Sequence, residues 1–114
     1  MSITVFCNAP KQLLHDIKQA IDDGSIVTWG YDKDGDFTHS VDQWDRQAWL
    51  RPVITADMLT FGLIGREGVT MGKVVYAVYH GRFIEMLLAH FDESFSLVSS
   101  TALGTQVDTF KSAS

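Results

Sequence analysis

The segment TWGYDKDGDFTH, from Thr28 to His39, predicts a β-hairpin. Strand-forming residues stand on both sides of an acidic centre that contains a glycine. Asp34-Gly35 is a strong two-residue turn signal, whereas Lys33–Gly35 can form a three-residue turn with its glycine in the left-handed conformation. Either turn joins two neighbouring antiparallel strands, so an antiparallel sheet is expected.

The aromatic side chains of the hairpin decide between the two turns. A three-residue turn gives the cross-strand pairs Asp32–Asp36, Tyr31–Phe37 and Trp29–His39. All the aromatic residues then lie on one face, where each such pair stabilises a sheet by roughly 0.2–1 kcal/mol. A two-residue turn would point Phe37 away from the other aromatic rings. We therefore expect the three-residue turn, although it sets two aspartates opposite each other.

The acidic turn also resembles the start of a calcium-binding loop. Asp32, Asp34 and Asp36 have the spacing of the first three ligand positions of such a loop. The sixth position, which requires glycine, is Phe37, and the twelfth, which requires a bidentate glutamate, is Gln43. We therefore predict a solvated turn, with no metal site and no cofactor.

Helical periodicity predicts two main helices, at about residues 10–23 and 81–92, each with apolar residues on one side. A third, short helix is predicted at about residues 41–48. Its evidence is Ser40 followed by Gln43, which have the spacing of a capping box.

The remaining apolar segments predict strands. Residues 73–80, KVVYAVYH, are rich in β-branched and aromatic residues, and residues 57–64 are their expected antiparallel partner. A last strand is expected at residues 95–101. Because strands and helices do not alternate strictly, we expect a single α+β domain at residues 1–103, with an antiparallel sheet of about four to six strands and the main helices on one face. Residues 104–114 have low apolar density and are expected to form a flexible tail.

Composition restricts the classes of partner. The net charge of −5 argues against binding to nucleic acid or to an anionic membrane, and it suits a basic protein partner. Cys7 is the only cysteine, so no internal disulfide can form, and it lies in an apolar run that predicts burial. No leader sequence is recognisable, and the cytoplasm is the expected location. Homo-oligomerisation through an exposed strand edge remains an open alternative.

Three residues are candidates for catalysis: His39, His80 and Arg82. If a strand ended at His80 and a helix began at Arg82, backbone N–H groups at this corner could hold an anion. A histidine and an arginine beside it would suit the binding or hydrolysis of a phosphate ester. The alternative is structural: a locally hydrogen-bonded His80, and Arg82 paired with Glu85.

Aromatic and arginine residues suggest a binding surface. The candidate binding residues are Trp29, Tyr31, Trp44, Arg46, Trp49 and Arg51. Tryptophan and arginine are enriched at binding hot spots, although tryptophans can equally close a sheet edge over the core. Since no catalytic sequence motif is recognisable, the leading interpretation is a non-enzymatic protein-interaction domain of the adaptor or immunity-protein type. The alternative is a small hydrolase or phosphate-ester-binding enzyme.

Overall fold

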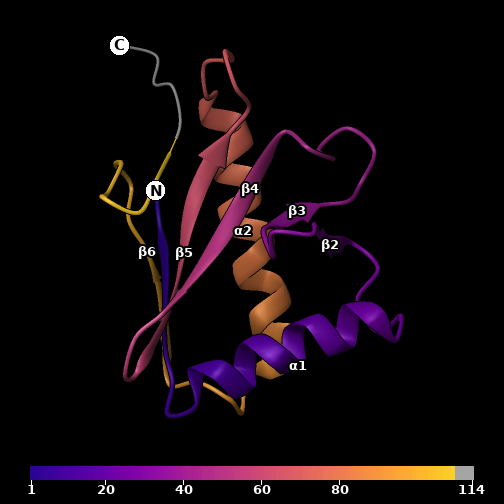
Figure 1. Ribbon diagram of the computed structural model, residues 1–114, viewed down its shortest axis with the longest axis vertical. Helices are drawn as coiled ribbons and strands as arrows, with labels where there is room; N and C mark the ends of the chain where they lie inside the picture. The colour runs from indigo at the N-terminus through magenta and orange to yellow at the C-terminus, as the bar shows by residue number, and fades with distance from the viewer. Residues whose placement is uncertain (110–114) are drawn as a thin grey trace.

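A six-stranded antiparallel sheet with two helices forms the protein in a computed structural model that describes residues 1–109 (Figure 1). The elements in chain order are β1 (Ile3–Phe6), α1 (Pro10–Asp22), β2 (Trp29–Tyr31), β3 (Phe37–His39), β4 (Ala48–Ile54), β5 (Met58–Gly65), α2 (Lys73–Phe91) and β6 (Leu97–Ser100). The strand order across the sheet is β2-β3-β4-β5-β1-β6. The predicted α+β class and the two main helices are confirmed.

The hairpin has the predicted register. Trp29 pairs with His39 and Tyr31 with Phe37. The N–H of Asp32 donates to the carbonyl of Asp36 at 3.0 Å, and Gly35 has a φ of 83°. The three-residue turn is therefore confirmed.

Both helices cover the same face of the sheet. Alternate residues of the strands, including Val5, Leu50 and Phe61, are buried against Ile17 of α1 and Phe83 of α2 in one core. In Figure 1, α2 runs along the sheet and α1 crosses near its lower end. Among residues 1–109, no helix covers the opposite face of the sheet, in keeping with the expectation that both helices share one face.

The strand predicted at residues 73–80 is wrong, because these residues are the first turns of α2. Their β-branched and aromatic side chains favour a strand by local propensity. Tyr79 and His80 are nevertheless buried together with Phe83. These three positions lie on one side of a helix, whereas in a strand the neighbouring residues Tyr79 and His80 would point to opposite faces. Gly81 is consequently an exposed residue within the helix and not a corner, and the predicted pairing of this segment with residues 57–64 does not exist.

The short helix predicted at about residues 41–48 is also wrong. Two successive turns stand there, in which Trp44 N–H donates to the carbonyl of Val41 and Gln47 N–H to that of Trp44. Arg46 has a φ of 56°, which interrupts a right-handed helix. The N–H of Arg46 donates to the Thr38 hydroxyl at 3.0 Å, whereas in a helix it would donate to a backbone carbonyl of the preceding turn.

Two strands, β1 and β4, are not anticipated by the sequence patterns. β1 lies between β5 and β6: Ile3 pairs with Phe61 on one side and with Ser100 on the other. β4 contains Pro52, which lacks an N–H and argues against an interior strand. Within residues 1–109, the pairing of β3 with β4 is confined to Phe37 and Leu50, so at Pro52 β4 is paired with β5 alone.

The described part of the C-terminal segment contacts β5. Thr109 N–H donates to the carbonyl of Leu63, and Gly65 N–H donates to the carbonyl of Thr109. A Cβ atom at Gly62 would stand 2.1 Å from the carbonyl oxygen of Val107, so only glycine permits this close approach. The remainder of the predicted flexible tail, residues 110–114, lies outside the described residues.

Candidate functional site

A pocket of about 270 Å³ opens between the hairpin, the turns at residues 41–47 and α2. It is lined by Thr28, Trp29, His39, Val41, Trp44, Arg82, Glu85, Met86, Ala89 and His90. Four of the residues predicted from sequence, Trp29, His39, Trp44 and Arg82, therefore share one site. The α2 residues recur at helical spacing, so they project from one side of the helix.

His39 forms the floor of this pocket. Its side chain is buried, and its ring stacks on Trp29 with a centroid separation of 4.7 Å. Its Nδ1 lies 2.8 Å from the carbonyl oxygen of Thr28. A carbonyl can only accept, so Nδ1 carries the proton and Nε2 is the free nitrogen of the neutral ring. Within the described chain, no buried polar side-chain atom lacks a hydrogen-bond partner, so Nε2, which has no partner among residues 1–109, is reached by solvent.

The charge state of His39 follows from its surroundings. Burial is the largest effect and lowers the pKa of His39, because the imidazolium form loses hydration. The hydrogen bond to Thr28 opposes this effect. The positive charge of Arg82 lowers the pKa further, and the negative charge of Glu85 raises it. At neutral pH the ring is therefore neutral and accepts a hydrogen bond at Nε2.

Tyr79 connects α2 to the turns that carry Trp44. Its side chain is fully buried, and its hydroxyl donates to the carbonyl of Trp44. The same oxygen lies 3.0 Å from the hydroxyl of Thr38 and accepts from Gln47 N–H at 3.3 Å. Tyr79 thus fixes one wall of the pocket from beneath. This role could not be recognised from the sequence, because the local pattern predicts a strand at Tyr79.

Arg82 and Glu85 stand at the edge of the pocket. Their charged atoms are 3.4 Å apart, and both side chains are mostly exposed, so the ion pair is weak and open to water. Glu85 and His90 are pocket residues that the sequence interpretation did not select. The helix predicted at residues 81–92 already placed both at helical spacing from Arg82, and this spacing is the signal that could have revealed them.

His80 does not belong to the pocket. It is buried, its Nδ1 lies 2.7 Å from the carbonyl oxygen of Tyr76, and its Nε2 lies 2.6 Å from that of Met1. Both ring nitrogens are thus occupied by the backbone. His80 links the first residue of the chain to α2, and the structure does not bring it together with His39 at one site.

The other candidate binding residues are dispersed. Tyr31 donates its hydroxyl to the carboxylate of Asp22 at 2.7 Å. Trp49 is half-buried and alternates with the buried Leu50 along β4, so it lies on the helix-free face of the sheet. Arg46 is exposed and lies 3.6 Å from the carboxylate of Asp45. None of these three residues lines the His39 pocket.

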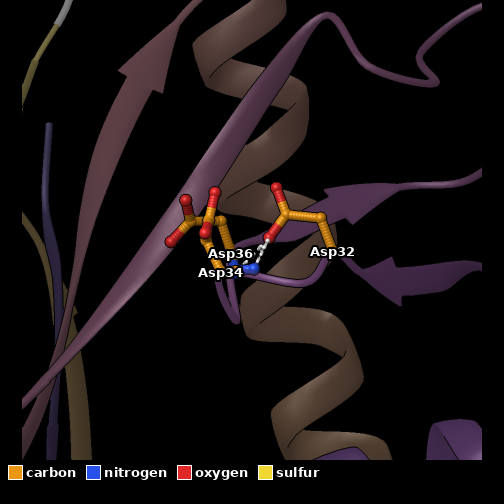
Figure 2. A group of neighbouring side chains, drawn as sticks. All are labelled: Asp32, Asp34 and Asp36. Atoms are coloured by element: carbon orange, nitrogen blue, oxygen red, sulfur yellow. Dashed lines mark hydrogen bonds between the residues drawn. The ribbon is translucent and has the colours of Figure 1, made fainter.

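The three aspartates of the hairpin turn lie close together, as Figure 2 shows. One carboxylate oxygen of each lies within 4.8 Å of the others, a spacing that a metal ion could bridge. The carboxylate of Asp32, however, accepts hydrogen bonds from two backbone N–H groups of the turn. The carboxylate of Asp36 accepts hydrogen bonds from Nε and Nη2 of Arg51, at 2.9 and 2.8 Å. The latter pair also raises the pKa of Arg51. These hydrogen bonds fix the carboxylates of Asp32 and Asp36 in place.

A larger pocket, of about 420 Å³, lies where the start of α1 meets residues 93–96. Cys7 lines it but is buried, and burial raises the pKa of its thiol, which disfavours the reactive thiolate. The expected burial of Cys7 is confirmed. This pocket offers no stacked aromatic wall, so the His39 pocket is the better candidate for recognition.

Neither helix within residues 1–109 has the length and apolar character that a membrane span needs. No family model, curated protein or solved structure matches this chain. The geometry of the His39 pocket therefore carries the functional inference.

Proposed function

We propose that the protein is a non-enzymatic interaction domain and that its His39 pocket receives a side chain of a protein partner. The observation that carries the proposal is the pairing of Trp29 beneath the pocket with a half-buried Trp44 at its wall. Tryptophan pockets that combine an apolar wall with a few polar groups are typical of binding hot spots. Val41, which is 40% exposed, extends the apolar surface at the rim.

The size of the pocket favours one side chain over a larger molecule. Sites for small-molecule ligands commonly enclose roughly 300–1,000 Å³. At about 270 Å³ the His39 pocket falls just below that range. A partner that inserts a single anchoring residue and covers the rim suits these dimensions. The net charge of −5 favours the approach of a partner with a basic surface.

A hydrolase or phosphate-ester-binding enzyme is the second candidate, because His39 and Arg82 do line the same pocket. Two features weigh against it. His80, the second expected acid–base group, is occupied by backbone carbonyls away from the pocket, and Glu85 competes with an anion for Arg82. We therefore rank the interaction domain first.

A matched pair of tryptophan variants tests the proposal. Trp44→Ala removes a wall of the pocket, whereas Trp49→Ala removes a half-buried tryptophan from the helix-free face. Both variants and the wild type are used as bait in extracts of the native host, after thermal unfolding has shown that each is folded. We expect a partner that Trp49→Ala retains and Trp44→Ala loses. A partner lost equally by both variants, or captured by neither of them nor by the wild type, contradicts the proposal.

Self-association is one further form that the interaction could take. β6 is an edge strand of the sheet, and residues 94–107 contain no charged side chain. Charged residues commonly protect such edges from pairing with another strand. Light scattering over a range of concentrations distinguishes a second copy of this chain from a different partner, since a monomer at every concentration excludes self-association.

A further inference from the structure

The chemistry of the anchoring side chain can be inferred from the hydrogen bonds of His39. Its Nδ1–H is directed to the carbonyl of Thr28. The only remaining polar atom of the neutral ring is Nε2, which offers a lone pair. A ligand in the pocket is thus met by an acceptor, and it gains a hydrogen bond there only if it brings an O–H or N–H group.

A charged ligand gains little electrostatic attraction from the charged residues at the edge of the pocket. Arg82 and Glu85 oppose each other at 3.4 Å, so their charges largely cancel for a group that enters between them. His90 is the remaining titratable side chain that lines the pocket, and it is exposed. A carboxylate or phosphate would place acceptor oxygens against the lone pair of Nε2, which is unfavourable.

The walls favour a flat apolar body. The ring of Trp29 stacks against His39, and Met86 and Ala89 of α2 line the pocket together with Trp44. Aromatic rings gain favourable offset or edge-to-face contacts with such walls. A methionine adds a polarisable surface that adapts to a ring.

Building on the proposed function, we propose that the His39 pocket takes a neutral hydrogen-bond donor on an aromatic ring, namely the phenol of a tyrosine side chain in the partner protein. The ring lies among Trp29, Trp44 and Met86, and the hydroxyl donates to Nε2 of His39. The phenol oxygen also has lone pairs that can accept a hydrogen bond from Arg82, while the hydroxyl proton is donated to Nε2 of His39. Tyrosine is a residue that combines an apolar body with a polar tip at interfaces.

Two probes that differ in one hydrogen-bond donor test the proposal. p-Cresol reproduces the tyrosine side chain, and 4-methylanisole replaces its hydroxyl by a methyl ether that cannot donate. Binding is followed by NMR shifts of the Trp29 indole and the His39 ring in the wild-type protein. One neutral hydrogen bond corresponds to roughly a three- to tenfold difference in affinity, so we expect p-cresol to bind tighter by that factor. Equal affinities, or no saturable shift with p-cresol, overturn the proposal.

A variant and a pH series assign the preference to His39. His39→Phe retains a ring against Trp29 but lacks the acceptor, so the two probes are expected to bind equally. At a pH acidic enough to protonate the ring, His39 becomes a donor at Nε2, and the wild type should lose its preference for p-cresol and bind 4-methylbenzoate more tightly than at neutral pH. A His90→Gln background should keep this response. Preference for 4-methylbenzoate at neutral pH overturns the proposal.

Failure of this inference can be told apart from failure of the proposed function. A partner that is lost specifically with Trp44→Ala, without any preference between the two probes, retains the interaction domain but rejects the phenol. Selective binding of p-cresol without a captured partner rejects the interaction domain and leaves a pocket for a small phenolic ligand.

Discussion

Replacing Tyr79 by phenylalanine removes one oxygen atom from the support of the pocket and keeps the buried ring. The hydroxyl donates to the carbonyl of Trp44 and accepts from Gln47 N–H, and both hydrogen bonds are lost in Tyr79→Phe. The two backbone groups still hydrogen-bond each other at 3.2 Å, so neither is left without a partner. One intramolecular hydrogen bond contributes a net stabilisation of about 1 kcal/mol, so we expect a loss of about 2 kcal/mol in the free energy of unfolding.

Urea denaturation and thermal unfolding measure this loss. For a domain of this size, 1 kcal/mol corresponds to a change of about 4 °C in Tm, so Tyr79→Phe should lower Tm by about 8 °C. The fluorescence of the protein should also shift, because the turn that holds the half-buried Trp44 becomes less constrained. The p-cresol affinity of the pocket should fall in parallel.

Tyr31→Phe is the matched control, because it removes the same atom from an exposed hydrogen bond. Its hydroxyl donates to Asp22 at the surface. An exposed hydroxyl regains its hydrogen bonds from water, so the expected loss is under about 0.5 kcal/mol. If Tyr79→Phe and Tyr31→Phe destabilise the protein equally, the idea that Tyr79 fixes the turns from beneath is refuted.

Three further changes have defined outcomes. Gly62→Ala places a Cβ against the carbonyl of Val107, so we expect a loss of about 1–3 kcal/mol and faster hydrogen exchange at Gly65 N–H; unchanged exchange would contradict this contact. Gly81→Ala, at an exposed helical position with nothing within 4 Å of the new Cβ, should stabilise the protein by about 0.5–1 kcal/mol in urea denaturation, and a loss would contradict the helix. Because burial lowers the pKa of His39 in the folded state, the unfolded chain takes up that proton first as the pH falls below the ordinary value of 6.5, so stability decreases on acidification. His39→Phe should show a smaller decrease in urea titrations between neutral and acid pH; an identical decrease would exclude His39 as its source.

The hairpin could be predicted from sequence because its determinants are local. Gly35 fixes the turn, and the turn length fixes which side chains share a face, so the Trp29–His39 pair followed from counting residues. α1 was predictable for a similar reason, since its apolar stripe and its flanking residues lie within one short segment.

The first half of α2 could not be predicted in the same way. Val74, Val75 and Tyr76 have local propensities that favour a strand, and their helical state depends on the burial of Tyr79 and Phe83 against residues distant in sequence. Tertiary packing outweighs differences in propensity of a few tenths of a kcal/mol per residue. The error displaced the expected site, because it created a corner at Gly81 that the helix does not contain.

The pocket itself was only partly accessible from sequence. Trp29 and His39 could be placed on one face, but their proximity to Arg82 depends on how α2 lies over the hairpin. Trp49 had the same residue type and a similar neighbourhood as Trp44, yet strand alternation puts it on the other face. Residue type suggests a binding role, and topology decides which residues can act together.

The interior position of β1 has a consequence for the order in which the chain folds. β1 precedes the other five strands of the sheet, yet its two neighbours, β5 and β6, are the last two of these strands to be synthesised. During translation both of its edges stay unpaired until residues 58–65 and then 97–100 have emerged from the ribosome. Such long-range pairing slows folding and lengthens the exposure of a strand with free edges. We therefore expect chains that end before β6 to aggregate, even though they contain both helices and the whole pocket.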